Sequence, residues 1–179
     1  MRLIEVANAA AYLRSTGRVA ADEPLEVTYL AGGVSNVVLH VRRPHTAGAD
    51  FVLKQARRQL RVPQPWFCSV ERIWREIETL NCCAELLDRE PSRRAGTNGG
   101  DASAHGAAAA ATVQVPRILF EDRDNFLFAM SAAPLGHATW KQKLLDGEYR
   151  ADIAAACGTL LGQLHGGTWH RPDVASRFE

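Results

Sequence analysis

The chain has 179 residues, enough for one domain or for one domain and part of another. Hydrophobic residues make up 46% and charged residues 23%, as in an ordinary globular protein with a substantial core. The formal net charge of +1 gives no electrostatic signature for nucleic acid or an anionic membrane. The sequence contains no run of 18 apolar residues, so no membrane-spanning helix is predicted. We therefore expect neither nucleic acid nor a membrane as a partner.

The N-terminal segment predicts an amphipathic helix that ends at Gly17. It is not typical of a signal peptide, because Glu5, Asn8 and Arg14 interrupt the apolar stretch that such a segment needs. The four cysteines show neither CxxC spacing nor a disulfide framework. Together these features favour a cytoplasmic protein.

Three β-like runs follow, at residues 25–30, 37–41 and 51–56, and they predict an antiparallel meander. The first turn of this meander contains Gly32 and Gly33. A glycine turn of this kind is often only a β-turn with no ligand, and its sequence matches neither G-x-G-x-x-G nor G-x-x-x-x-G-K-[ST].

A long helix is predicted next, with Ser69 as its N-cap and apolar residues at helical spacing. Residues 89–112 then contain Gly, Ala, Ser and Arg but no large apolar side chain, so we expect a disordered insertion there. Strand character resumes on both sides of a polar turn at residues 122–125. A short helix near residues 139–145 and a longer one near 149–165, closed by His165, complete the pattern.

This order of elements resembles the N-terminal lobe of the protein-kinase-like fold, and in detail the aminoglycoside phosphotransferase family, closest to its methylthioribose-kinase-like branch. The stretches that carry the resemblance are LAGGVSNVVLHV, FVLKQA, LRVPQPWFCSVERIWREIETL, VPRILFEDRDNFLFAM and WKQKLLDGEYRADIAAACGTLLGQLH. The resemblance implies an α+β fold in which residues 1–134 form an ATP-binding N-lobe, with a five-stranded antiparallel sheet and one long helix. Residues 135–179 would form the hinge and an incomplete, helical beginning of the C-lobe.

In such a lobe the glycine turn covers the phosphates of ATP, because glycine lets backbone N–H groups approach anionic oxygens. The resemblance assigns this role to Gly32 and Gly33, with Ser35 and Asn36 as additional polar donors. Lys54, at the end of FVLK, resembles the kinase lysine that contacts the α and β phosphates and pairs with a glutamate of the next helix. A lysine at a strand end is otherwise simply solvated.

The helical angles select the glutamate partner. Glu76 lies roughly 80° from the centre of the apolar face, at the rim of the buried side, whereas Glu71 and Glu78 lie well over 100° away. A glutamate at the rim can reach inward to a strand, so we expect an ion pair between Lys54 and Glu76. The alternative is that Lys54 and Glu76 form a surface ion pair unrelated to nucleotide binding. If the two residues proved to be far apart, an α+β domain with no ligand would be favoured.

The run FLFAMSAAPLG resembles the last strand and the hinge between the lobes, where backbone groups bind adenine. In this alignment Met130 is the gatekeeper, and the adenine ring is bound by the backbone carbonyl of Ser131 and the backbone amide of Ala133. The alternative is a strand that runs into a loop.

The resemblance implies a kinase that uses ATP and Mg²⁺ to phosphorylate a hydroxyl on a sugar, aminoglycoside, choline or methylthioribose type of acceptor. No residue up to Glu179 matches the base aspartate or the metal ligands of the family's catalytic loop, so we expect no catalytic or metal-binding residue in this chain and no turnover by the chain alone. The apolar surface left for the partner lobe would promote self-association. The alternative is a non-catalytic nucleotide-binding or interaction module.

Overall fold

The computed structural model describes residues 1–31, 33–46, 49–89, 114–134 and 136–179. The chain divides into two compact units, one comprising Met1–Thr79 and Pro116–Pro134 and the other Leu80–Val115 and Leu135–Glu179. Apart from residue 89, the insertion expected at residues 89–112 lies outside the described residues, as does Gly32. Among the described helices, none has the length and apolar character needed to cross a bilayer.

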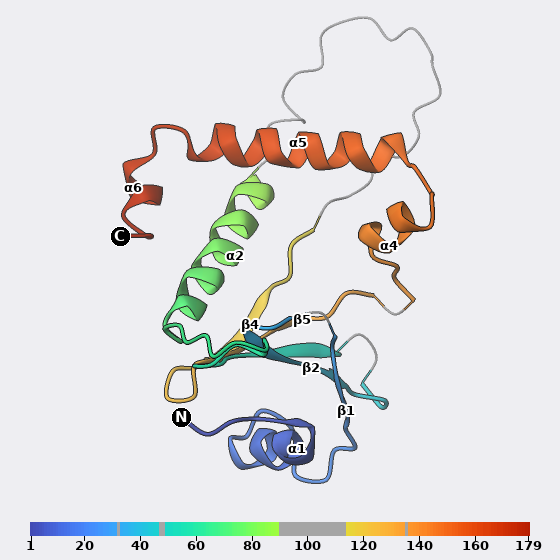
Figure 1. The fold of residues 1–179 in the computed structure, drawn as a ribbon, viewed down its shortest axis with the longest axis vertical. Helices are drawn as coiled ribbons and strands as arrows, with labels where there is room; N and C mark the ends of the chain where they lie inside the picture. Colours follow the sequence, from blue (N-terminus) through green and yellow to red (C-terminus); the bar gives the residue numbers. More distant parts are fainter. Residues whose placement is uncertain (32, 47–48, 90–113, 135) are drawn as a thin grey trace, which may run out of the picture. The chain divides into compact units, whose positions relative to one another are not determined.

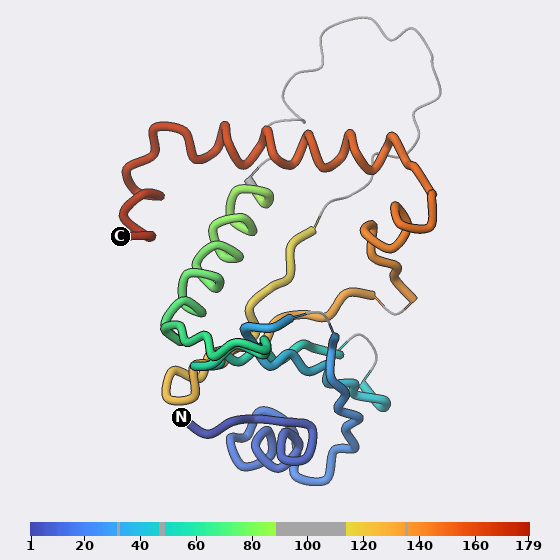
Figure 2. Tube along the Cα trace, viewed as in Figure 1, coloured from blue at the N-terminus to red at the C-terminus, as the bar shows by residue number. Residues whose placement is uncertain are grey.

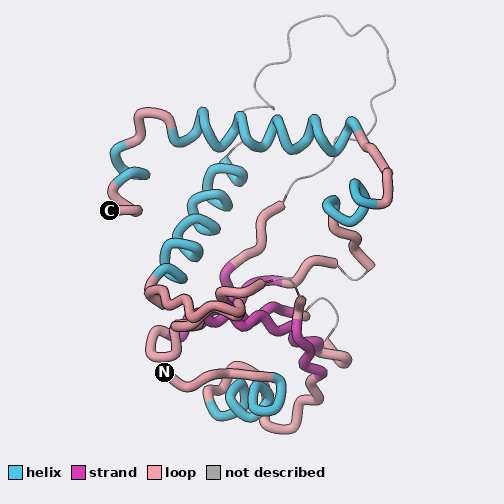
Figure 3. Tube along the Cα trace, in the orientation of Figure 1, coloured by secondary structure: helices cyan, strands magenta, loops and turns pink. Residues whose placement is uncertain are grey.

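The first unit is built on a five-stranded antiparallel sheet, drawn in magenta in Figure 3. In chain order the strands are β1 (Glu26–Tyr29), β2 (Asn36–Arg42), β3 (Phe51–Ala56), β4 (Ile118–Asp122) and β5 (Leu127–Ser131). In the sheet their order is β1-β2-β3-β5-β4, so the first three form the expected meander and β5 lies between β3 and β4, as the path of the chain in Figure 2 shows. The α+β class and the five-stranded antiparallel sheet are confirmed.

Helix α1 (Val6–Ser15) covers one face of this sheet (Figure 1). It ends as predicted, with Gly17 in the left-handed region at φ 67° and its N–H donating to the Arg14 carbonyl. Every second residue of the central strands points toward α1, because side chains alternate between the two faces of a sheet. The core formed in this way contains Ile4, Ala9, Tyr12, Leu13, Val37, Leu39, Val41, Phe51, Leu53, Leu127 and Ala129.

A buried glutamine on the same face holds three segments together. Gln55 is 1% exposed, and its Oε1 accepts a hydrogen bond from the Ile4 N–H at 2.8 Å. Its Nε2 donates to the carbonyls of Arg2 at 2.7 Å and Asn125 at 2.8 Å. This amide therefore ties the chain's first residues and the β4–β5 turn to β3, with its buried polar atoms satisfied.

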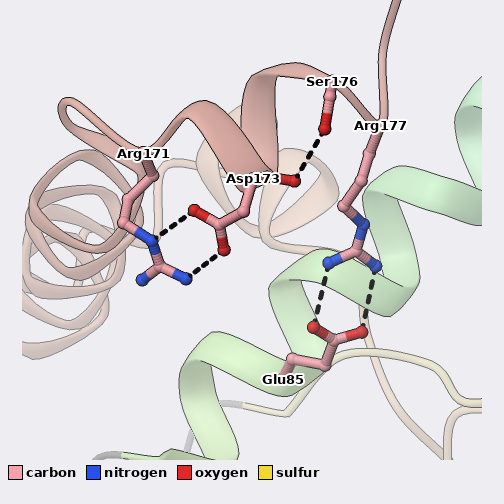
Figure 4. Close-up of polar contacts among 5 residues, drawn as sticks. All are labelled: Glu85, Arg171, Asp173, Ser176 and Arg177. Atoms are coloured by element: carbon pink, nitrogen blue, oxygen red, sulfur yellow. Dashed lines mark hydrogen bonds and ion pairs between the residues drawn. The ribbon is translucent and has the colours of Figure 1, made fainter.

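Helix α2 (Arg72–Arg89) begins in the first unit and ends in the second. The Ser69 hydroxyl accepts a hydrogen bond from the N–H of Glu71 at 3.1 Å. Because α2 begins only at Arg72, Ser69 caps the turn at residues 70–71 that leads into the helix and is not the N-cap that was predicted. Near the other end, Glu85 forms a two-pronged ion pair with Arg177, both N–O distances being 2.9 Å (Figure 4). Arg171 makes a similar pair with Asp173.

The second unit contains α4 (Trp140–Leu145), α5 (Ala151–Thr168) and α6 (Pro172–Ala175) in addition to the last part of α2. Thr139 caps α4 by accepting a hydrogen bond from the Gln142 N–H. Helix α5 extends three residues past His165, so the prediction that His165 closes this helix was wrong, although its carbonyl accepts a hydrogen bond from the N–H of Trp169 just beyond the helix. The glycines and threonine after His165 continue the helix despite their low propensity.

Candidate functional site

The turn between β1 and β2 has unused backbone donors. The N–H groups of Val34 and Ser35 have no hydrogen-bond partner among the described residues, and neither does the Ser35 hydroxyl. Successive free N–H groups in a turn can bind an anion where they converge on one point. Ser35 is therefore placed where it can donate, as the sequence suggested.

Gly33 adjoins these donors, and no contact or backbone angle in the described part of the chain requires a glycine there. A Cβ built on Gly33 would meet no atom within 4 Å, and Gly33 is not among the residues with positive φ. The space in front of its backbone is therefore open to a ligand. A glycine that neither packing nor backbone conformation requires is consistent with close approach by a bound group.

Asn36 has a different place from the one expected. It is the first residue of β2, is 8% exposed, and its Oδ1 accepts a hydrogen bond from the Arg72 guanidinium at 3.3 Å. Because strand pairing with Ala56 buries this side chain beside Arg72, it contributes to the structure of the turn. Of the expected polar donors, Ser35 fits the role better than Asn36.

Lys54 of β3 and Glu76 of α2 form the ion pair that the helical angles predicted, with Lys54 Nζ donating to Glu76 Oε1. Both residues belong to the first unit. The side chains are partly exposed, 21% for Lys54 and 35% for Glu76, so water and ligands can reach them. A partly exposed pair contributes only about 0–1 kcal/mol to folding, which leaves the ammonium group available for another role.

Apolar side chains surround Lys54 on its face of the sheet. Val38 and Phe128 lie directly opposite Lys54 on the neighbouring strands, and Met130 lies opposite Val52, two residues before the lysine. Residues that face each other across antiparallel strands share a face, so these four side chains and the lysine lie on the side opposite α1. Sequence reasoning found Met130 but missed Val38, Val52 and Phe128. The two-residue alternation from Lys54 could have found Val52, whereas Val38 and Phe128 depend on the register between strands.

The expected hinge residues follow β5 directly. The Ser131 side chain accepts a hydrogen bond from the N–H of Arg117 at 2.9 Å, and its own N–H donates to the Arg117 carbonyl at 2.9 Å. Ser131 therefore anchors the start of β4 to β5. The N–H of Ala133 is exposed and has no partner within the described part of the chain, so it can donate to a ligand.

A separate open pocket of about 540 Å³ lies in the first unit, at the connection between β3 and α2. None of the expected site residues lines it; the lining residues are Arg58, Phe67, Cys68, Ser69, Val70, Glu71 and Phe126. Within residues 1–31, 33–46, 49–89, 114–134 and 136–179, no three His, Cys, Asp or Glu side chains gather as a metal site. The candidate site is therefore defined by the glycine turn, the ion pair and the apolar face around Lys54.

Comparison with known proteins adds no assignment: no family model matches the chain, and no curated protein matches it significantly.

Proposed function

We propose that this chain is the ATP-binding part of a small-molecule kinase of the aminoglycoside phosphotransferase type. The observation that carries the proposal is the ion pair between Lys54 and Glu76, which joins a central strand to the following helix beside a glycine turn. In the kinase-like arrangement a lysine paired in this way contacts the phosphates of ATP. The five-stranded sheet with α2 then corresponds to the N-lobe.

The chemistry of the site fits a nucleotide triphosphate. The free N–H groups of Val34 and Ser35 and the ammonium group of Lys54 are donors suited to phosphate oxygens. The partly exposed apolar side chain of Met130 offers a contact for the adenine ring, and the Ala133 N–H offers a donor to its edge. Mg²⁺ would neutralise charge on the bound phosphates, and a hydroxyl acceptor would receive the γ-phosphoryl group.

Titration of the purified chain with a fluorescent ATP analogue tests the proposal. Lys54→Met should weaken binding at least about tenfold, the equivalent of 1.4 kcal/mol. Lys141→Met is the matched control, because Lys141 is an exposed lysine of α4 with no ion-pair partner among the described residues. Equal affinities for the wild type and Lys54→Met would contradict the proposal.

The alternative, a nucleotide-binding module without transfer, predicts the same binding result. An assay of ADP production in the presence of Mg²⁺ and of sugar, aminoglycoside and choline acceptors tests transfer directly. ADP production that depends on an acceptor and is lost in Lys54→Met would support the kinase and contradict the expectation of no turnover by this chain alone. Binding without such production is the result expected of this chain under either alternative.

A further inference from the structure

The guanidinium group of Arg72, in the first turn of α2, is surrounded by acceptors from the glycine turn and its neighbours. It donates to the carbonyls of Ser35 at 2.5 Å and Arg57 at 3.2 Å, and to Asn36 Oδ1 at 3.3 Å. It also donates to the carbonyl of Ser69. Only the planar, five-donor guanidinium of arginine can bind so many acceptors at once.

A second arginine binds the same turn from the segment that follows β3. The Arg61 Nη2 donates to the carbonyls of Gly33 at 3.0 Å and Asn36 at 3.1 Å, and the Arg61 N–H donates to the Val34 carbonyl at 2.8 Å. With the bond from Arg72 to Ser35, four consecutive carbonyls, from residue 33 to residue 36, are bound by these two arginines. We call this set of contacts the carbonyl clamp.

The clamp determines which way the free donors point. In a trans peptide group the C=O of one residue and the N–H of the next are directed to opposite sides. Because the carbonyls of Gly33 and Val34 are held by Arg61, the N–H groups of Val34 and Ser35 are directed away from that arginine. The clamp also neutralises the partial negative charge of carbonyls that would repel an anion at the turn.

We infer that Arg61 and Arg72 are positioning residues for phosphate binding. Arg61 binds the carbonyls that precede the free N–H groups of Val34 and Ser35, Arg72 binds the next carbonyl, that of Ser35, and together they hold residues 33–36 so that the free N–H groups face the bound phosphates. Arg72 and Glu76 are four residues apart on α2 and therefore lie on the same side of the helix. One binds the turn and the other binds Lys54, so α2 sets both phosphate-binding groups relative to each other. This inference rests on the proposed function.

Binding measurements with ligands that differ in phosphate content test the inference. We expect Arg72→Gln to weaken binding of ATP and ADP at least about tenfold while adenosine binds within about twofold of the wild type. Arg75→Gln is the matched control, since Arg75 is an exposed arginine of the same helix whose guanidinium has no hydrogen-bond partner among the described residues. An equal loss for all three ligands would show general damage to the site and overturn the inference.

Two further variants separate positioning from direct charge attraction and from misfolding. Arg72→Lys keeps the charge but not the planar fork, so ATP binding should stay weakened; full recovery would mean that charge alone acts. Arg61→Gln removes side-chain bonds to Gly33 and Asn36 and should give the same difference between ATP and adenosine. It supplies the test if Arg72→Gln fails to fold.

The ligand-free protein distinguishes failure of the clamp from failure of the proposed function. In ¹H–¹⁵N spectra without nucleotide, Arg72→Gln should shift or broaden the amide resonances of Val34 and Ser35, whereas Arg75→Gln should leave them unchanged. Unchanged resonances in Arg72→Gln would overturn the inference even if ATP binds. If Arg72→Gln disorders the turn but the wild-type protein binds no ATP, the role of the clamp is supported and the proposed function is contradicted.

Discussion

Glu76 accepts a hydrogen bond from Lys54, 22 residues earlier in the chain, and the pair connects α2 to the face of the sheet opposite α1. Its partial exposure limits its contribution to folding to about 0–1 kcal/mol. The pair therefore matters more for the position of the Lys54 ammonium group than for the free energy of unfolding. Its effects on unfolding and on ATP affinity can be measured separately.

Reversal of the pair provides that measurement. The double variant Lys54→Glu with Glu76→Lys retains two opposite charges, so we expect its free energy of unfolding in urea to lie within about 1 kcal/mol of the wild type. ATP binding should not return, because a carboxylate then occupies the position on β3 that faces the phosphates. The single variant Lys54→Glu is the control. Recovery of ATP affinity in the double variant would show that only the pair itself, and not the lysine on β3, is needed.

Glycine substitutions distinguish a residue required by the backbone from one required by a ligand. Gly17→Ala should destabilise the protein by about 1 kcal/mol, because Gly17 has φ 67° and alanine is strained there. Gly33→Ala should leave the midpoint of thermal unfolding nearly unchanged, since its Cβ meets no atom within 4 Å. ATP should raise the midpoint of thermal unfolding less in Gly33→Ala than in the wild type. An undiminished increase would show that phosphate does not approach this backbone.

The sequence predicted the features of the fold that depend on local periodicity. Apolar β-like runs bounded by turn residues located all five strands, and the helical angles selected Glu76 as the partner of Lys54.

The contacts that the sequence did not predict involve long side chains that reach across elements. Arg72 and Arg61 bind carbonyls of a turn more than 20 residues earlier, and no periodicity indicates such a contact. Gln55 occupies a buried position in β3 that alternation would assign to an apolar residue. Polar groups in the interior are satisfied by whichever backbone atoms the tertiary fold brings near, so their partners emerge only from the structure.

Gln55 is expected to be among the most sensitive positions for stability. Gln55→Leu has a similar volume but leaves the buried N–H of Ile4 and two carbonyls without this partner, so we expect a loss of about 2–4 kcal/mol. Gln64→Leu, at an exposed glutamine of the loop before α2, should change the free energy of unfolding by less than about 0.5 kcal/mol. Urea denaturation of both variants measures the difference. A loss below about 1 kcal/mol for Gln55→Leu would show that the first residues of the chain are not held by this amide in solution.

The contact between Tyr12 and Asp122 predicts a dependence of stability on pH. Tyr12 is 4% exposed and its hydroxyl donates to Asp122 Oδ2 at 2.7 Å. Burial and the neighbouring carboxylate raise the pKa of Tyr12, so the phenol remains a donor. Burial by itself would raise the pKa of Asp122, but hydrogen bonds from Asn125 and Tyr12 outweigh it and lower this pKa below its usual value.

A carboxyl group whose pKa is lower in the folded state stabilises the protein above its unfolded pKa, about 3.9, and loses this contribution as the pH falls through the folded pKa. Tyr12→Phe should therefore destabilise the protein by about 1.5–2 kcal/mol at pH 7, the range for a hydrogen bond to a charged group. The difference from the wild type should narrow as the pH falls below the unfolded pKa of about 3.9 and through the lower pKa of Asp122 in the folded protein. Tyr29→Phe is the matched control, because Tyr29 is 50% exposed on β1 and its hydroxyl has no hydrogen-bond partner among the described residues. Urea denaturation at pH 7, 5 and 3 measures both variants, and a difference for Tyr12→Phe that is constant with pH would contradict a hydrogen bond to an ionised Asp122.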